Sequence, residues 1–149
     1  KKNNKPKVIL AGKKINDSMC IYVAKNILKY LRVNKNKTKK ILILGAAFKE
    51  NCSDIRNSKI FDTIHYLEKK GIKIYLYDPL IPVEELKNVT GNVVKRLNKK
   101  NFYDGAVISV SHDEFKKIGS RKIKQNVKNQ GFIFDLKSTF PKNQTDWQL

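Results

Sequence analysis

The segment 44–59, LGAAFKENCSDIRNSK, gathers several kinds of side chain that could do chemistry. Lys49 offers a mobile ammonium, and Arg56 offers a planar guanidinium that can bind a diphosphate or carboxylate through two parallel hydrogen bonds. The glycine and two alanines before them permit fairly close approach of the backbone to a ligand. The segment therefore predicts an anion site. The alternative is that Asp54 and Arg56 form a structural ion pair and leave Lys49 solvated.

The same segment lacks the glycine pattern of a dinucleotide-binding turn. That pattern, GxGxxG, needs a second glycine where Ala47 stands. The acid after the next predicted strand, Asp78, lies well beyond the roughly 20-residue spacing expected of an acid that binds ribose. The turn thus predicts an anion site without the usual grip on NAD.

The two cysteines and two histidines bear on nucleophilic catalysis and metal binding. Cys20 and Cys52 form neither a CxxC motif nor a cluster at zinc spacing, so we expect no structural zinc and no disulfide framework. Such cysteine use fits a reducing, cytoplasmic setting. Cys52 lies near a basic group that favours a thiolate, but without a nearby histidine we expect it to be inert. His112 precedes a predicted helix, and we interpret it as a capping or ligand-edge residue rather than an acid–base catalyst.

The net charge of +19 raises the possibility of a nucleic-acid-binding module. Arginine, the usual residue for two-pronged contacts to bases and phosphates, supplies only four of the 32 basic residues. The lysines are scattered, apart from KNKTKK at 35–40. We therefore attribute the charge mainly to lysine-rich composition, and keep the basic nucleic-acid-binding module as an alternative.

Composition also bounds the class of protein. Hydrophobic residues make up 40% of the chain, enough for a core, and no apolar run approaches the roughly 20 residues that span a bilayer. The first residues, KKNNKPK, include neither an initiating Met nor the apolar core of a signal peptide. We expect the chain to be part of a longer protein.

The elements that must position these residues follow from apolar periodicity. A helix is predicted over 13–32, with two apolar stripes that should pack against more than one partner, and a linker over 33–40. Further strands are predicted at 41–44, 72–77, 106–110 and 132–136, with a weak strand at 93–97, and helices at 57–70, 83–87, 112–118 and 120–127.

This alternation predicts an α/β fold: a Rossmann-like three-layer sandwich with a mostly parallel sheet. Ligands of such sheets bind beyond the carboxyl ends of the strands. The segments that leave four of the predicted strands carry FKENCSDIR, DPLIP, SHDEF and KSTF. The anion site is therefore expected at the edge of the sheet where the carboxyl ends of the strands lie.

The pattern FKxxxxDxRxS, formed by Phe48, Lys49, Asp54, Arg56 and Ser58, resembles the C-terminal domain of the UDP-glucose/GDP-mannose dehydrogenase family. IYLYDP, AVISVSHDEFKKI and FIFDLKS resemble its later strands, and ILAGKKINDSMCIYVAKNIL resembles the end of its central helical region. FKENCxDIRN, KKIND and SHDEF are most similar to the branch that oxidises UDP-N-acetylglucosamine or UDP-N-acetylgalactosamine to uronic acids for surface polysaccharide.

The resemblance implies roles for individual residues. Phe48 and Lys49 match positions that hold the UDP-sugar, and Arg56 matches one that reaches the NAD bound by another domain. Lys137 stands where many members have an arginine that contacts substrate across a dimer. The substitution removes the guanidinium fork and so weakens the case for that contact.

The resemblance also implies how the chain is divided and what accompanies it. Residues 1–38 would end the central dimerisation region, and residues 39–149 would form the UDP-sugar-binding domain of a cytoplasmic homodimer. We expect no nucleic-acid or membrane partner.

Two parts of the family's layout have no counterpart in the sequence: the N-terminal NAD-binding domain, and the catalytic cysteine of an upstream GxC motif, which neither Cys20 nor Cys52 matches. The resemblance implies a full-length enzyme that oxidises a sugar C6 hydroxyl to a carboxylate with two NAD⁺, and we expect this chain alone to be inactive. The alternatives are the nucleic-acid module and a free-standing thiol enzyme that uses Cys52.

Overall fold

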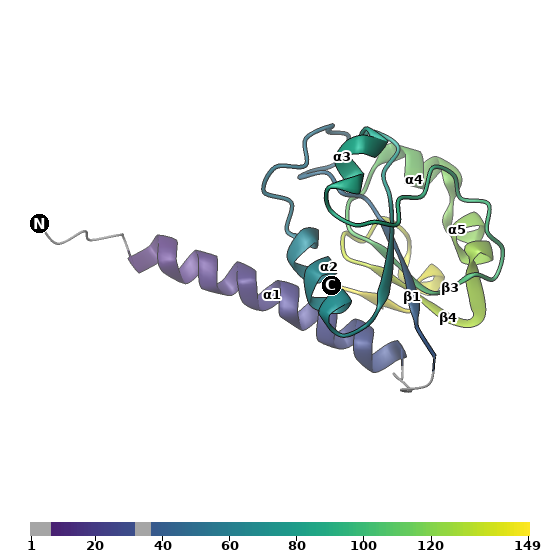
Figure 1. The fold of residues 1–149 in the computed structure, drawn as a ribbon, viewed down its shortest axis with the longest axis horizontal. Helices are drawn as coiled ribbons and strands as arrows, with labels where there is room; N and C mark the ends of the chain where they lie inside the picture. The colour runs from purple at the N-terminus through teal and green to yellow at the C-terminus, as the bar shows by residue number, and fades with distance from the viewer. Residues whose placement is uncertain (1–6, 32–36) are drawn as a thin grey trace, which may run out of the picture.

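A five-stranded sheet with helices on both faces forms the body of the protein, and one long helix projects from it (Figure 1). The computed structural model describes residues 7–31 and 37–149. Half of the predicted linker 33–40, residues 33–36, lies outside these residues. The helices are α1 (Lys7–Leu31), α2 (Ile60–Lys69), α3 (Val83–Lys87), α4 (Asp113–Ile118), α5 (Ser120–Asn126) and the 3₁₀ turn η1 (Lys142–Gln144). The strands are β1 (Lys40–Leu44), β2 (Lys73–Tyr77), β3 (Tyr103–Ile108), β4 (Val127–Asp135) and β5 (Trp147–Gln148).

The strands lie in the order β2-β1-β3-β4-β5, and every pairing is parallel. Leu44 pairs with Tyr77 on one side and Ile108 on the other, so three strands end level at the same edge. The chain crosses from β2, on one side of β1, to β3 on the other side. The segments after β1 and β3 therefore diverge at a switch point, where ligands of open parallel sheets bind. The predicted fold class is confirmed.

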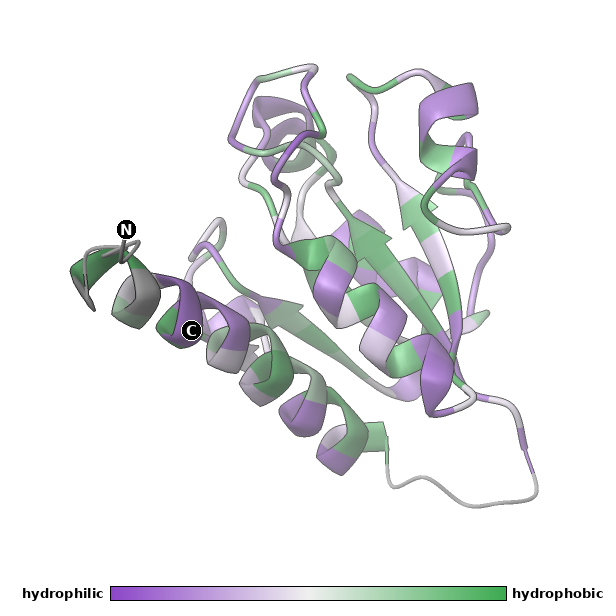
Figure 2. Ribbon diagram, turned by 60° about the vertical axis from the view of Figure 1, so that its left-hand side comes forward, coloured by the Kyte–Doolittle hydropathy of each residue, from purple (hydrophilic) through white to green (hydrophobic). Residues whose placement is uncertain are grey.

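The core forms two layers because side chains alternate across the sheet. Ile41 and Ile43 point toward the face covered by α1 and α2, and Leu42 and Leu44 point toward the face covered by α4 and α5. All four are fully buried. A strand covered on both faces needs a continuous apolar sequence, which explains the run ILIL at 41–44 (Figure 2).

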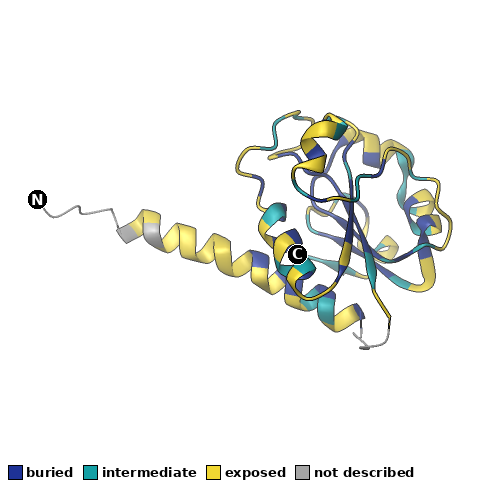
Figure 3. Cartoon of the chain, viewed as in Figure 1, coloured by how far each residue is buried: buried dark blue, intermediate teal, exposed yellow. Residues whose placement is uncertain are grey.

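Only the C-terminal part of α1 packs on the sheet. Val23, Ala24 and Ile27 are buried, whereas Val8 and Ile15 are 82% and 63% exposed (Figure 3). The helix begins at Lys7, six residues before the predicted start, and its outer half carries apolar side chains that this chain leaves uncovered. Among the residues described, no helix has the length and hydropathy needed to cross a membrane.

Several element bounds differ from the predicted ones. The helix predicted at 57–70 begins at Ile60, because Asn57 adopts a left-handed backbone with φ +62° that a helix cannot contain. It ends before Gly71, whose φ of +80° is the predicted helix stop. The strand predicted at 93–97 is reduced to one bridge between Val93 and Leu76. β3 spans residues 103–108 rather than 106–110.

At the C-terminal end, β4 begins at Val127, five residues before the predicted strand, and β5 was not predicted. Two residues are too few for a periodic signal. Trp147 is nevertheless held firmly, since its ring stacks on Phe134 with centroids 4.8 Å apart. This short edge strand completes the sheet beside β4.

Candidate functional site

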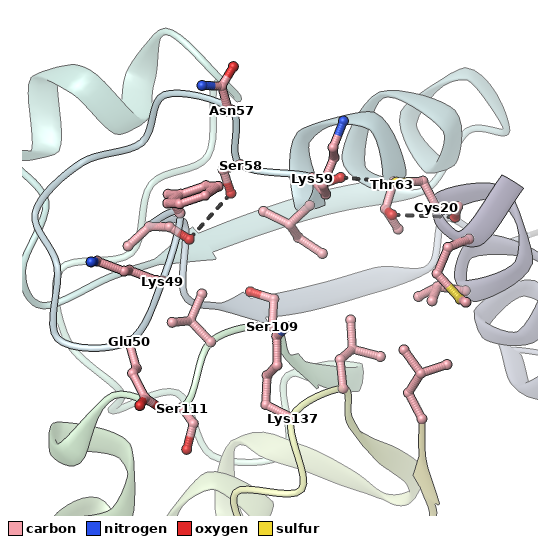
Figure 4. A pocket seen from close by; sticks show the side chains of 18 residues that line it. Cys20, Lys49, Glu50, Asn57, Ser58, Lys59, Thr63, Ser109, Ser111 and Lys137 are labelled. Atoms are coloured by element: carbon pink, nitrogen blue, oxygen red, sulfur yellow. Dashed lines mark hydrogen bonds between the residues drawn. The ribbon is translucent and has the colours of Figure 1, made fainter. Parts of the chain in front are cut away.

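A cleft of about 630 Å³ opens at the carboxyl edge of the sheet, and its volume is typical of small-molecule sites (Figure 4). Its walls are residues 47–50 and 57–59 between β1 and α2, the start of α2, the segments that leave β3 and β4, the C-terminal residue and part of α1. The polar side chains that line it are Lys49, Glu50, Asn57, Ser58, Lys59, Thr63, Ser109, Ser111 and Lys137. Apolar side chains from α1 and α2 line its other end.

Three of the four predicted site residues meet at this cleft. Phe48 and Lys49 come from the turn after β1, and Lys137 comes from the loop after β4, 88 positions further along the chain. Phe48 is 58% exposed, which is unusual for a phenylalanine and leaves its ring available to a ligand. The parallel sheet therefore brings together residues that are far apart in the sequence.

The fourth predicted residue, Arg56, is not part of the cleft wall. Its Nε and Nη2 donate to the two carboxylate oxygens of Asp54, at 3.0 and 2.8 Å. These hydrogen bonds from Arg56 lower the pKa of Asp54 to about 2. The Arg56 side chain remains 84% exposed. The ion pair that the sequence offered as an alternative to an anion site is thus present alongside a cleft that Lys49 lines.

The cleft is basic. Its lining includes three lysines, Lys49, Lys59 and Lys137, and one acid, Glu50, and the hydroxyls of Ser109 and Ser111 add neutral donors. Lys59 was missed by the sequence interpretation. Its signal was its place next to Ser58 at the start of a helix, where backbone N–H groups also favour an anion. An aromatic ring beside ammonium groups suits a ligand that combines a flat ring with a diphosphate.

A buried carboxylate fixes the turn that carries Phe48 and Lys49. Asp78, at the end of β2, accepts hydrogen bonds from the N–H groups of Ala46 and Leu80, at 2.7 and 2.9 Å. Burial alone raises the pKa of Asp78, but the hydrogen bonds from His112, Ala46 and Leu80 outweigh it and hold the pKa below its usual value. Asp78 is therefore an ionised structural anchor for the turn.

The same anchor bears on NAD binding. The N–H groups of Ala46 and Ala47 follow β1, where a dinucleotide-binding turn presents its donors to the pyrophosphate, and both donate to Asp78. Donors already bound to a carboxylate are not free for a phosphate. The turn after β1 therefore does not fit a dinucleotide, in agreement with its missing glycine.

His112 is neither a capping residue nor a residue at the edge of the ligand site, the two roles that the sequence suggested for it. It is fully buried, does not line the cleft and makes no side-chain cap to α4. Its Nε2 lies 3.0 Å from Asp78 Oδ2, and its Nδ1 accepts the N–H of Asn51 at 2.9 Å. The capping of α4 comes instead from Asn51 Oδ1, which accepts the N–H of Asp113.

A second buried carboxylate fixes the loop that carries Lys137. Asp135, the last residue of β4, is fully buried and accepts the N–H groups of Lys137 and Phe140, at 3.2 and 2.9 Å. Ser138 within this loop has φ +50°. The cleft has two lips, the turn that carries Phe48 and Lys49 and the loop that carries Lys137. Each lip is thus tied to an aspartate at a strand end.

The thiols differ from catalytic ones in their surroundings. Cys20 lines the cleft but is buried, and burial raises its pKa, which disfavours a thiolate. Cys52 is half-buried outside the cleft wall. Within residues 7–31 and 37–149, no group of three or more His, Cys, Asp or Glu residues could hold a metal ion.

We expect Gly45→Ala to lower the free energy of unfolding by about 1–2 kcal/mol, because a side chain there is strained in two ways. Gly45 has φ +103°, and a Cβ would lie 2.8 Å from the Cβ of Val110. Urea denaturation measures the loss. Gly91→Ala is the matched control, since nothing lies within 4 Å of a Cβ there. Equal stability of the two variants would contradict the expectation.

Residues 42–142 match the sequence profile of the UDP-glucose/GDP-mannose dehydrogenase family, UDP binding domain. The chain is 36% identical over 147 residues to the UDP-N-acetyl-D-glucosamine 6-dehydrogenase of Salmonella typhi, covering 97% of this chain and 34% of that protein. It is 31% identical over 147 residues to the enzyme of that name from Pseudomonas aeruginosa, covering 97% and 35%. The chain spans about a third of the length of these relatives.

A solved structure shares the fold. The UDP-N-acetyl-mannosamine dehydrogenase Cap5O from Staphylococcus aureus superposes with a TM-score of 0.74 at 22% identity, covering 98% of this chain and 34% of that one. A UDP-glucose dehydrogenase from Pyrobaculum islandicum gives a TM-score of 0.68 at 18% identity, covering 91% and 30%. At such identities the likeness concerns the arrangement of helices and strands.

Proposed function

The chain belongs to the UDP-glucose/GDP-mannose dehydrogenase family, and we propose that it is the UDP-sugar-binding domain of a longer nucleotide-sugar 6-dehydrogenase. The observation that carries the proposal is the basic cleft where Phe48, Lys49 and Lys137 meet. Residues 39–149 would form this domain, and residues 1–38 would end a central helical region. The names of the relatives favour a UDP-N-acetylhexosamine, with the gluco sugar ahead of the galacto sugar.

The cleft would bind the substrate through complementary chemistry. The ammonium groups of Lys49 and Lys137 lie on opposite lips, so both can approach one diphosphate. The exposed ring of Phe48 offers a face on which a uracil can stack. Because both lips are tied to buried aspartates, little ordering is left to be done when the ligand binds.

The reaction of the longer protein would convert a primary alcohol to a carboxylate. The C6 alcohol gives up two hydrides to two NAD⁺, water supplies the second carboxylate oxygen, and three protons are released. This chain would hold the substrate while a cysteine and an NAD-binding domain elsewhere in the polypeptide carry out the chemistry. Arg56 would reach NAD from outside the cleft, through the guanidinium edge that Asp54 leaves uncovered.

The remaining expectations concern assembly and setting. The exposed apolar half of α1 would be covered in a homodimer of the longer protein. The enzyme would work in the cytoplasm and supply a uronic acid nucleotide for surface polysaccharide. The relatives lend no support to the alternative of a nucleic-acid-binding module.

Calorimetric titration of the chain with UDP and with UDP-N-acetylglucosamine tests the proposal. We expect both to bind, with dissociation constants between about 0.1 and 1 mM because the missing parts of the enzyme complete the site. We also expect no NADH to form when NAD⁺ is added. A single-stranded RNA titrated at two salt concentrations is the comparison. Tight, steeply salt-dependent RNA binding without UDP binding would support the nucleic-acid alternative.

A further inference from the structure

We propose that His112 is a positioning residue for substrate binding, which secures the turn bearing Phe48 and Lys49 without touching the ligand. The inference rests on the proposed function, because it assigns the turn to the UDP-sugar. It adds a residue that lies outside the cleft and 61 positions from the nearer end of the turn.

The protonation of the ring follows from its partners. The N–H of Asn51 can only donate, so His112 Nδ1, which receives it at 2.9 Å, must be the bare nitrogen. The proton then sits on Nε2 and is donated to Asp78 Oδ2 at 3.0 Å. The neutral imidazole thus accepts a hydrogen bond at one nitrogen and donates one at the other, and these two bonds fix the orientation of the ring.

Both ends of the turn are tied to one carboxylate, and one of them is tied to it through this ring. Ala46 donates directly to Asp78 Oδ2, and Asn51 reaches the same oxygen through His112. Between the anchors Ala47, Phe48, Lys49 and Glu50 line the cleft; Ala47 is buried, and the other three are exposed. The hydrogen bonds of Ala46 and Asn51 therefore hold the exposed residues 48–50 in place, since these side chains pack little against the core.

The C-terminal anchor also keeps an uncommon backbone conformation in place. Asn51 has φ +54°, which asparagine tolerates better than most residues but which still needs support. Its side chain accepts the N–H of Asp113 at 3.0 Å, so the turn is tied to the start of α4 as well. The ring of Phe115 in α4 packs on His112 with centroids 5.3 Å apart and limits its tilt. The imidazole is fully buried, so water cannot take over its hydrogen bonds.

The test compares substitutions at the two histidines of the chain. His112→Phe keeps an aromatic ring but removes both nitrogens, and His112→Gln restores a donor and an acceptor on neighbouring atoms. His65→Phe, on the exposed side of α2, is the matched control. Each variant is titrated with UDP, and its amide hydrogen exchange is followed at residues 46–52 and in β1. His112→Leu replaces His112→Phe if the latter does not fold.

With His112→Phe we expect the dissociation constant for UDP to rise about tenfold, the cost of one buried polar group losing its partner. Exchange should speed up at 46–52 while β1 stays protected, since the loss is local. His112→Gln should bind within about threefold of the native chain, and His65→Phe should match it.

Unaltered exchange at 46–52 in His112→Phe overturns the inference, as does unaltered UDP affinity. Exchange that speeds up equally in β1, or His112→Gln no better than His112→Phe, overturns it too, because the histidine would then serve general stability. If the native chain binds no UDP, the proposed function fails, and the exchange measurement still decides whether His112 secures the turn.

Discussion

Replacing Lys49 by methionine is expected to weaken the binding of UDP to this chain by about tenfold to hundredfold, or roughly 1.5–3 kcal/mol, the usual contribution of a hydrogen bond to a charged group. Methionine keeps the apolar stem and removes only the ammonium. Lys49 lines the cleft beside Phe48 and carries no acidic partner among the ion pairs of the described residues. Its charge is therefore available to the diphosphate.

The choice of ligand sharpens this experiment. Uridine carries the base and ribose of UDP but no diphosphate, so Lys49→Met should leave its weak binding unchanged. Lys69→Met is the matched control variant, because Lys69 ends α2 at the opposite edge of the sheet. Calorimetry on the three proteins with both ligands gives the comparison. An equal loss for uridine and UDP would show that Lys49 shapes the turn rather than binding the diphosphate, and a loss with Lys69→Met would show a general charge effect.

The cleft was predictable because parallel strands impose its position. The apolar pattern predicted strands at 41–44 and 132–136, which end in the structure at Leu44 and Asp135, and parallel pairing places both ends at one edge. Phe48, Lys49 and Lys137 were therefore expected at the same edge of the sheet, and the structure places all three in the lining of one cleft. The resemblance to a known family assigned them roles, and the roles of Phe48, Lys49, Arg56 and Lys137 all remain predictions.

The supports of the cleft were not predictable in the same way. Asp78 and His112 are 34 positions apart, and each has an ordinary local explanation: an acid before a proline, and a histidine before a helix. Their contact depends on how β2 and α4 sit in three dimensions. Apolar periodicity carries no information about which polar groups meet inside a core. The late start of α2 was missed for a related reason, since Asn57 gives no sign in the sequence of its positive φ.

Both lips are held in the same way, by a fully or nearly fully buried aspartate at the end of a strand. Asp135 accepts N–H groups from the loop that follows its own strand, and Asp78 accepts N–H groups from the turn after the neighbouring strand β1. A buried carboxylate is stable only when several donors surround it. Such an anchor has little freedom, because moving the loop leaves the charge without partners. The cleft is therefore preformed, which keeps the entropic cost of binding low.

Asp78→Ala is expected to lower the free energy of unfolding at neutral pH by about 3 kcal/mol, because it leaves several buried donors without an acceptor at 1–3 kcal/mol for each. These donors are the N–H groups of Ala46, Ala47 and Leu80 and the Nε2–H of His112. Urea denaturation at neutral pH measures the loss. Asp17→Ala, on the exposed outer half of α1, should change stability by less than about 0.5 kcal/mol and is the control.

The dependence on pH separates the charge of Asp78 from its shape. In the folded chain the pKa of Asp78 is lowered from its ordinary value of 3.8, so the ionised carboxylate stabilises the fold at all pH values above that ordinary value. The contribution disappears as the pH falls through the folded-state pKa. Asp78→Asn has nearly the native shape and cannot ionise, so its deficit should be complete at neutral pH and should shrink below about pH 4. A deficit that stays constant or grows on acidification would mean that the anchor works through packing, and that the turn before Phe48 and Lys49 is held by something other than a buried charge.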